Sequence, residues 1–317
     1  MIDRLGRNIT YLRISVTDKC NLRCRYCMPE EGVCKKSHVD MMTEDEIVQA
    51  AEVAAELGIH KIRITGGEPL VKKNIVSICR RIAAVEGIEE VCLTTNGILL
   101  PQLGQALKDA GVKRINLSLD TLDGQKYAHI TRIGKLEAFQ AGLEAALAVG
   151  YEKIKVNAVL IGGFNDDEIV PLANLTKTYP LDMRFIELMP ILGSDEFGDS
   201  AYVPYSRVLE KLPDAVPVDP DGGVAKLYRL PDAKGNIGLI SPISAHFCKD
   251  CNRLRLTQDG KLKPCLHGEE EYNIKGLGFD EMKAVMEQAI WNKPAWHGDL
   301  DAVNRSKAGR NMNEIGG

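Results

Sequence analysis

The stretch TDKCNLRCRYCMP, residues 17–29, contains Cys20, Cys24 and Cys27 in a C-x3-C-x2-C spacing. This triplet offers three soft thiolate ligands to a metal centre that requires four. A four-iron, four-sulfur (4Fe-4S) cluster bound by three cysteines keeps one iron open to a small molecule. Structural zinc is the alternative, but zinc sites usually combine two cysteine pairs that complete the shell of ligands. The spacing therefore favours an iron-sulfur cluster that takes part in chemistry.

The composition indicates where this chemistry takes place. The chain of 317 residues has nine cysteines and a net charge of −4. It has no apolar run of about 18 residues and no recognisable signal peptide, so we expect a cytoplasmic protein. In a reducing compartment, cysteines at this frequency indicate metal ligation and buried thiols, not disulfides. The slightly acidic balance gives no reason to expect binding to nucleic acid or to a membrane.

Strand-like and helix-like segments alternate from Tyr11 to about Met189. Thr43 followed by Glu46 predicts a capped helix start, and Gly58 predicts the end of that helix. The alternation predicts repeated βα units and a parallel sheet. The strands are expected at residues 11–16, 61–65, 90–94, 114–118, 153–160 and 183–188.

Apolar and polar residues alternate in five of these strands, which is unusual for a parallel sheet that is covered on both faces. A solvated edge would explain the alternation in one strand. In five strands together it favours a polar lumen, with the apolar faces turned to the helices. Buried cations are costly unless a polyanion such as a triphosphate compensates them. The candidate cations are Arg13, Lys61, Arg63, Lys155 and Arg184.

A second triplet, Cys248, Cys251 and Cys265, lies in HFCKDCNRLRLTQDGKLKPCLH, residues 246–267. Asp259-Gly260 between two alternating runs predicts a hairpin that returns Cys265 to the first pair. Spacing alone leaves two interpretations open, a second cluster or a zinc site completed by His246 or His267. Two arginines, Arg253 and Arg255, would project from one face of the hairpin close to the metal.

The first triplet, with Tyr26 at its aromatic position, resembles the signature of the radical S-adenosylmethionine (SAM) superfamily. Gly66-Gly67-Glu68-Pro69 after the second strand resembles the segment with which that superfamily binds the SAM amino group. The resemblance implies an α/β fold, an incomplete (βα)6 barrel closed by a C-terminal β-rich and helical extension. It implies a radical SAM part at residues 1–190 and a C-terminal part with the second cluster at residues 191–317.

Both triplets, the segment CNRLRLTQDGKLKPCL and the terminal Ile315-Gly316-Gly317 together resemble the GTP 3′,8-cyclase family of molybdenum-cofactor biosynthesis. The resemblance covers essentially the whole chain, and it implies that the Gly-Gly tail reaches into the active site. It implies that the six cysteines of the triplets hold two 4Fe-4S clusters. The implied SAM contacts are Tyr26 through its backbone, Gly67, Ser118 and Met189. The implied GTP contacts are Arg13, Arg63, Thr94, Lys155, Arg253, Leu254 and Arg255, with Lys61 and Arg184 as further triphosphate contacts.

The chemistry that this resemblance implies begins with one-electron cleavage of SAM to a 5′-deoxyadenosyl radical, which removes the 3′ hydrogen of GTP. The sugar radical then attacks C8 of guanine and gives 3′,8-cyclo-7,8-dihydro-GTP. An external flavodoxin-like reductant would supply electrons, and cyclic pyranopterin monophosphate synthase would follow in the pathway. The expected assembly is a monomer or a homodimer.

Two other functions agree with parts of the pattern. A radical SAM enzyme that modifies a peptide could carry an auxiliary cluster on the C-terminal cysteines, but it has no evident need for a cationic lumen. A zinc protein without catalytic activity would contain zinc and no iron. The remaining cysteines, Cys34, Cys79 and Cys92, are expected to be unligated thiols.

Overall fold

The computed structural model describes residues 1–33, 38–192, 194–220, 222–301 and 304–316. Its strands form one twelve-stranded sheet in the order β12-β11-β10-β1-β2-β3-β4-β5-β6-β9-β8-β7. The strands are β1 (Tyr11–Ser15), β2 (Lys61–Thr65), β3 (Glu90–Thr95), β4 (Val112–Ser118), β5 (Lys153–Leu160), β6 (Asp182–Glu187), β7 (Val216–Pro217), β8 (Lys226–Arg229), β9 (Ile237–Ile240), β10 (Arg253–Leu256), β11 (Lys261–Lys263) and β12 (Tyr272–Asn273).

The helices of the described residues include nine α-helices and five short 3-10 helices. The α-helices are α1 (Glu44–Glu56), α2 (Ile75–Ala83), α3 (Leu100–Asp109), α4 (Gly124–Thr131), α5 (Leu136–Val149), α6 (Ile169–Thr178), α7 (Ser206–Lys211), α8 (Phe279–Trp291) and α9 (Met312–Ile315). The 3-10 helices are η1 (His38–Asp40), η2 (Pro69–Val71), η3 (Ser194–Phe197), η4 (Asp199–Ala201) and η5 (Cys248–Asp250).

The six central strands confirm the predicted βα units. Strands β1 to β6 are neighbours in sequence order, and each pair is parallel. The strands begin and end within two residues of the predicted positions; β4, for example, begins at Val112, two residues before Arg114. The predicted capping box of α1 is present, because Thr43 and Glu46 exchange side-chain and backbone hydrogen bonds.

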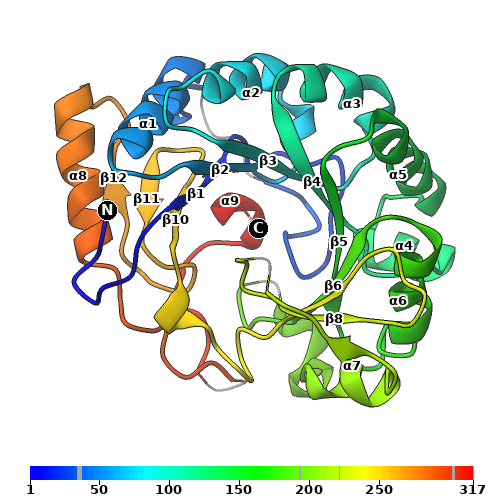
Figure 1. Cartoon of the computed structure of the whole chain (residues 1–317). Helices are drawn as coiled ribbons and strands as arrows, with labels where there is room; N and C mark the ends of the chain where they lie inside the picture. The colour runs from blue at the N-terminus through cyan, green and yellow to red at the C-terminus, as the bar shows by residue number, and fades with distance from the viewer. Residues whose placement is uncertain (34–37, 193, 221, 302–303, 317) are drawn as a thin grey trace.

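Helices α1 to α6 lie outside the curved sheet, and the strands surround a central space (Figure 1). The helices turn their apolar stripe to the sheet, as α2 does with Ile75, Ile78, Cys79 and Ile82, all of which are buried. Together with the apolar face of the strands, these stripes form the main hydrophobic core. Of the described helices, none is long and apolar enough to cross a membrane.

The C-terminal strands join both edges of the central sheet, which the sequence pattern did not predict. Strand β10 pairs in parallel with β1, and β9 pairs in parallel with β6. The predicted hairpin is confirmed, since β10 and β11 are antiparallel and Gly260 has a φ of +75° in the turn. In β10, Leu254 and Leu256 enter the core, so Arg253 and Arg255 face the other side.

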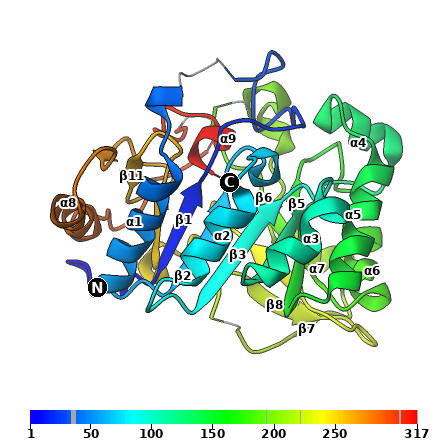
Figure 2. The ribbon, with the colours of Figure 1, turned by 90° about the horizontal axis from the view of Figure 1, so that it is seen from above.

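The last helix, α9, lies inside the ring of strands in Figure 1. In Figure 2 the arrow of β1 points toward α9, which places the tail at the carboxyl ends of the strands. Parallel-barrel enzymes place their active sites at this end.

Candidate functional site

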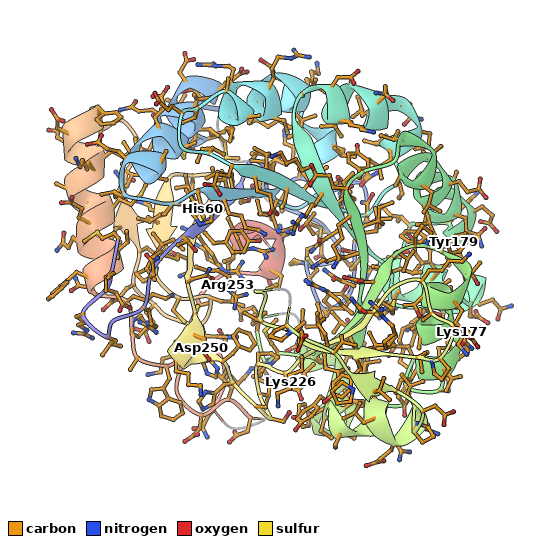
Figure 3. All side chains as sticks on the ribbon, in the orientation of Figure 1. His60, Lys177, Tyr179, Lys226, Asp250 and Arg253 are labelled. Carbon is orange, nitrogen blue, oxygen red and sulfur yellow. The ribbon has the colours of Figure 1, made fainter. Side chains whose placement is uncertain are left out.

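A cavity of about 970 Å³ occupies the centre of the molecule and contains residues of both cysteine triplets in its wall. In Figure 3 Arg253 lies inside the ring of strands, whereas Lys177 and Tyr179 of the α6 region lie at the rim. The polar faces of the central strands line this cavity, as their alternation predicted. These strand residues include Arg13, Lys61, Arg63, Thr65, Thr94, Arg114, Asn116, Ser118, Lys155, Asn157 and Arg184.

The first triplet lies in the loop after β1, and Cys20, Cys24 and Cys27 all line the cavity. The loop is tightly wound, because the amide of Cys27 donates to the carbonyl of Cys24 at 2.9 Å. Burial raises the pKa of Cys20 to about 11 and that of Cys27 to about 12. These thiols thus lie close together in a poorly solvated pocket, where a positively charged metal centre would favour their thiolate forms.

The glycines of the GGEP turn allow β2 to approach the cysteine loop. A Cβ on Gly67 would lie 2.5 Å from the carbonyl oxygen of Lys19, and a Cβ on Gly66 would lie 2.6 Å from that of Thr17. The amide of Gly67 instead donates to the carbonyl of Thr17 at 2.7 Å. A side chain at either glycine would displace the loop that carries the first triplet.

Glu68 of the same turn is a residue whose role the sequence did not reveal. Its buried carboxylate accepts hydrogen bonds from the Thr95 hydroxyl at 2.7 Å, the Asn96 amide at 2.7 Å and the Leu70 amide at 3.0 Å. Burial outweighs these bonds and raises its pKa to about 7. Glu68 therefore ties the carboxyl end of β2 to that of β3 beside the cavity.

Tyr26 and Ser118, two of the predicted SAM contacts, lie near Asp120 at the end of β4. The Tyr26 hydroxyl donates to Asp120 at 2.8 Å, and the Val159 amide donates to the other carboxylate oxygen at 2.9 Å. Burial raises the pKa of Asp120 to about 6. The other two predicted SAM contacts, Gly67 and Met189, line the same cavity.

The second triplet lies beside β10 and β11, as the hairpin predicted. Cys248 is in η5, Cys251 follows it, and Cys265 comes two residues after β11; all three line the cavity. Although burial alone would raise it, Lys293 and Arg253 lower the pKa of Cys251 to about 7. Both cations therefore stabilise the thiolate form of Cys251.

Within the described residues, neither histidine of the zinc alternative forms a hydrogen bond with a cysteine thiol. His267 shares a hydrogen bond with the Ser306 hydroxyl at 3.1 Å, and the His246 ring packs 5.7 Å from that of Trp296. Among the residues that the structure describes, no three His, Cys, Asp or Glu side chains converge to hold one metal ion. A 4Fe-4S cluster binds each cysteine through a different iron, so its ligands do not converge on one ion. Both triplets fit such a cluster by donor chemistry and burial.

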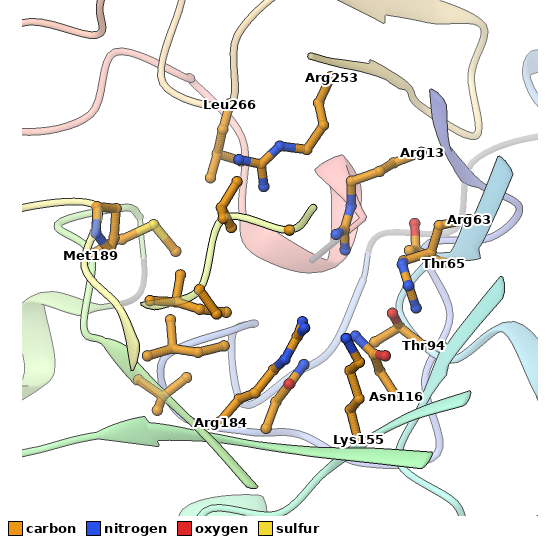
Figure 4. A pocket seen from close by; sticks show the side chains of 18 of the residues that line it. Arg13, Arg63, Thr65, Thr94, Asn116, Lys155, Arg184, Met189, Arg253 and Leu266 are labelled. Atoms are coloured by element: carbon orange, nitrogen blue, oxygen red, sulfur yellow. The ribbon is translucent and has the colours of Figure 1, made fainter. Parts of the chain in front are cut away.

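Ten Lys and Arg residues but only three Asp and Glu residues line the cavity, counted over the described part of the chain. Figure 4 shows Arg13, Arg63, Lys155, Arg184 and Arg253 pointing into it from different strands. Burial, together with the nearby charges of Arg63 and Arg253, lowers the pKa of Arg13 to about 10. These cations repel one another in a region of low dielectric constant, so an anionic ligand would stabilise them. The cationic lumen is confirmed.

Two predicted GTP contacts, Lys61 and Leu254, have environments that differ from those of the others. Lys61 already forms an ion pair with Glu90 at 2.7 Å. Leu254 is fully buried in the hydrophobic core and is not part of the cavity wall. Arg184 does line the cavity.

The C-terminal tail contacts the cationic wall. The carbonyl of Gly316 accepts a hydrogen bond from Arg255 at 2.6 Å, and the Asn313 side chain donates to the carbonyl of Asp18 at 3.2 Å. A Cβ on Gly316, whose φ is +81°, would collide with the Thr65 hydroxyl. The structure therefore places Gly316 against the wall of the cavity, as the resemblance implied; Gly317 lies outside the described residues.

The other cysteines do not contribute to the cavity wall in the described part of the chain. Cys79 in α2 and Cys92 in β3 are fully buried, and their expected role as unligated thiols stays a prediction. The prediction for Cys34 falls outside the described residues.

Comparisons with known proteins match the chain to two family models and, over its whole length, to curated relatives. The Radical SAM superfamily model matches residues 14–176, and the Molybdenum Cofactor Synthesis C model matches residues 181–298. GTP 3′,8-cyclase from Alkaliphilus metalliredigens (strain QYMF) is 47% identical over 321 residues, which cover 100% of both chains. GTP 3′,8-cyclase from Moorella thermoacetica is 47% identical over 327 residues, again covering 100% of both chains.

Among solved structures, Streptococcus suis SuiB superimposes with a TM-score of 0.67 at 15% identity. The superposition covers 92% of this chain and 67% of SuiB. At this identity the likeness concerns the fold alone.

Proposed function

The chain belongs to the GTP 3′,8-cyclase family of the radical SAM superfamily, and we propose that its cavity binds SAM at one cysteine triplet and GTP at the other. The enzyme converts GTP to (8S)-3′,8-cyclo-7,8-dihydroguanosine 5′-triphosphate, the first step of molybdenum cofactor biosynthesis. Its cofactors are SAM and a 4Fe-4S cluster. When bound and reduced, that cluster supplies the electron that cleaves SAM to the 5′-deoxyadenosyl radical.

The observation that carries the proposal is that both triplets and the cationic wall belong to one cavity. Cys20, Cys24 and Cys27 would hold the cluster that binds SAM. Around its open iron, SAM would contact the backbone of Tyr26 together with Gly67, Ser118 and Met189. Binding in one cavity would hold SAM in a fixed position relative to GTP.

GTP would bind on the opposite set of residues. We assign Cys248, Cys251 and Cys265 to a second 4Fe-4S cluster, which would bind the guanine base of GTP. Guanidinium groups bind phosphate oxygens through two parallel hydrogen bonds, which suits a triphosphate. The residues assigned to GTP are Arg13, Arg63, Thr94, Lys155, Arg253 and Arg255, with Arg184 as a further triphosphate contact. Leu254 would contribute through its main chain alone, and Lys61 would have to leave Glu90.

Further proposals concern the architecture, the assembly and the partners of the enzyme. We interpret the six βα units as an incomplete (βα)6 barrel that the C-terminal region closes. We propose a division at residue 190; the first family model ends at residue 176 and the second begins at residue 181. We also propose a cytoplasmic monomer or homodimer that receives electrons from a flavodoxin-like protein. Its product would pass along the pathway to cyclic pyranopterin monophosphate synthase.

One anaerobic preparation tests this proposal. Two clusters require about eight iron and eight sulfide per chain, and SAM consumption should depend on added GTP. About four iron per chain would contradict the second cluster. Zinc without iron would contradict the whole proposal, and cleavage of SAM that ignores GTP would contradict the choice of substrate.

A further inference from the structure

Lys293 follows α8 and reaches the cavity wall with a side chain that is almost completely buried, 2% exposed. A buried ammonium group is costly unless its three N–H donors find acceptors. Its Nζ donates to the carbonyl of Arg253 at 2.8 Å and to that of Pro264 at 2.5 Å. Its charge also acts on Cys251, whose pKa it lowers. Two of its three donors thus have carbonyl acceptors in the described part of the chain.

These acceptors belong to the two arms that carry the second triplet. Arg253 comes two residues after Cys251, and Pro264 immediately precedes Cys265. The charge of Lys293 also acts on Cys265. One ammonium group thus connects the two sides of the hairpin at the point where the cysteines enter the cavity.

Arg7 fixes the backbone on which Lys293 stands. Its guanidinium donates to the carbonyl of Cys248 at 3.0 Å and to that of Lys293 at 3.1 Å. Asp3 pairs with the same guanidinium at 2.6 Å. The segment after α8 is therefore tied through Arg7 to the main chain at Cys248, although the two are distant in sequence.

Lys263 on β11 shows what an ordinary buried lysine does in the same sheet. It is fully buried and donates to the Glu271 carboxylate at 3.1 Å and to the Gly268 carbonyl at 2.9 Å. Its charge is neutralised by a carboxylate, as is usual for a buried cation. Lys293 instead directs its charge toward thiols that a cluster would use, which is difficult to explain by stability alone.

We propose that Lys293 is a positioning residue of the second cluster: through the carbonyls of Arg253 and Pro264 it holds Cys251 and Cys265 in place, and its buried positive charge beside them raises the reduction potential of the cluster. A nearby positive charge stabilises the more negative, reduced form of an iron-sulfur cluster and so makes its reduction easier. This inference rests on the proposed function, because it takes the second triplet to bind a cluster.

The test isolates the second cluster in the full-length chain. With Cys20, Cys24 and Cys27 replaced by alanine, the only cluster that remains is the one proposed at the second triplet. In this background, Lys293→Met, Lys293→Arg and the matched control Lys263→Met are reconstituted anaerobically. Iron content and the midpoint potential are measured, the latter by a redox titration followed by electron paramagnetic resonance.

We expect Lys293→Met to shift the midpoint potential to a more negative value, Lys293→Arg to restore most of the shift, and Lys263→Met to leave it unchanged. Loss of iron in Lys293→Met alone would support the inference as well, through the positioning role. An unchanged potential in Lys293→Met, or equal loss of iron in both methionine variants, would overturn it. Absence of iron from the parent background would overturn the second cluster and with it this inference.

Discussion

Arg253 shows at the scale of one residue why the cavity requires an anion. Its guanidinium carbon lies 4.9 Å from the centre of the Phe247 ring, and its Nε is buried without a hydrogen-bond partner in the described part of the chain. Such a donor is costly unless a ligand supplies the acceptor. A phosphate or guanine oxygen would do so.

Arg253→Ala should therefore weaken GTP binding. Loss of a charge-assisted hydrogen bond should reduce the affinity at least roughly tenfold, as measured by calorimetry. Arg207→Ala is the matched control, since Arg207 is exposed and pairs with Glu210 on the surface. Equal GTP affinities of the unsubstituted protein, Arg253→Ala and Arg207→Ala would contradict a role of Arg253 in GTP binding.

Gly67 shows a different kind of requirement, the close approach of two backbones. Gly67→Ala places a Cβ 2.5 Å from the Lys19 carbonyl oxygen and should displace the cysteine loop. We expect iron content to fall from about eight to about four per chain, since only the first cluster would be lost. Gly124→Ala is the control, because a Cβ at Gly124 meets nothing within 4 Å. Full iron content in Gly67→Ala would contradict this account of the turn.

At the scale of elements, local patterns predicted the strands of the central sheet and one hairpin. Alternation predicted which strand face is polar, and Asp259-Gly260 predicted the turn between β10 and β11. The parallel pairing of β10 with β1 and of β9 with β6 was not predictable, because no local pattern specifies a partner so distant in sequence. Strand β10 nevertheless alternates like the five central strands, which was a signal for its place beside them.

The candidate site, too, was predictable from the sequence only in part. The cysteines were recognisable from their close spacing within each triplet, and the strand cations from their alternation with apolar residues. Lys293 and Arg7 carry no such signal, since their roles arise from contacts with carbonyl groups that only the folded chain brings together. Lys61 was recognisable as a cation, but its pairing with Glu90 on the neighbouring strand was not.

The short helix α9 gives a prediction at this scale. Gly316→Ala cannot keep its φ of +81° without strain and would collide with Thr65, so the contact between the tail and Arg255 should be lost. We expect GTP turnover to fall by roughly ten- to a hundredfold, because small displacements in an active site are costly. Iron content should not change.

Gly309→Ala separates this effect from strain in general. Gly309 also has a positive φ, +62°, but a Cβ there meets nothing within 4 Å. Both variants put an alanine at a positive φ, but only the Cβ of Gly316→Ala would collide with Thr65. Equal turnover in both would show that the position of the tail does not matter.

At the scale of the whole molecule, the sign of the net charge is opposite to that of the cavity wall. Its net charge is −4, yet the cavity wall is strongly cationic. Low-dielectric walls concentrate such a field, which attracts an anionic nucleotide into the interior. Both cysteine triplets share this interior, so we infer that they serve one reaction at two positions.

Comparing Cys24→Ala with Cys265→Ala tests this claim most directly. Under anaerobic conditions with reductant, SAM and GTP, both 5′-deoxyadenosine and the cyclised nucleotide are measured by chromatography. Cys24→Ala should form neither product, because the cluster that cleaves SAM is lost. Cys265→Ala should form 5′-deoxyadenosine uncoupled from GTP and no cyclised nucleotide. Cyclised nucleotide from both variants at equal rates would contradict the account.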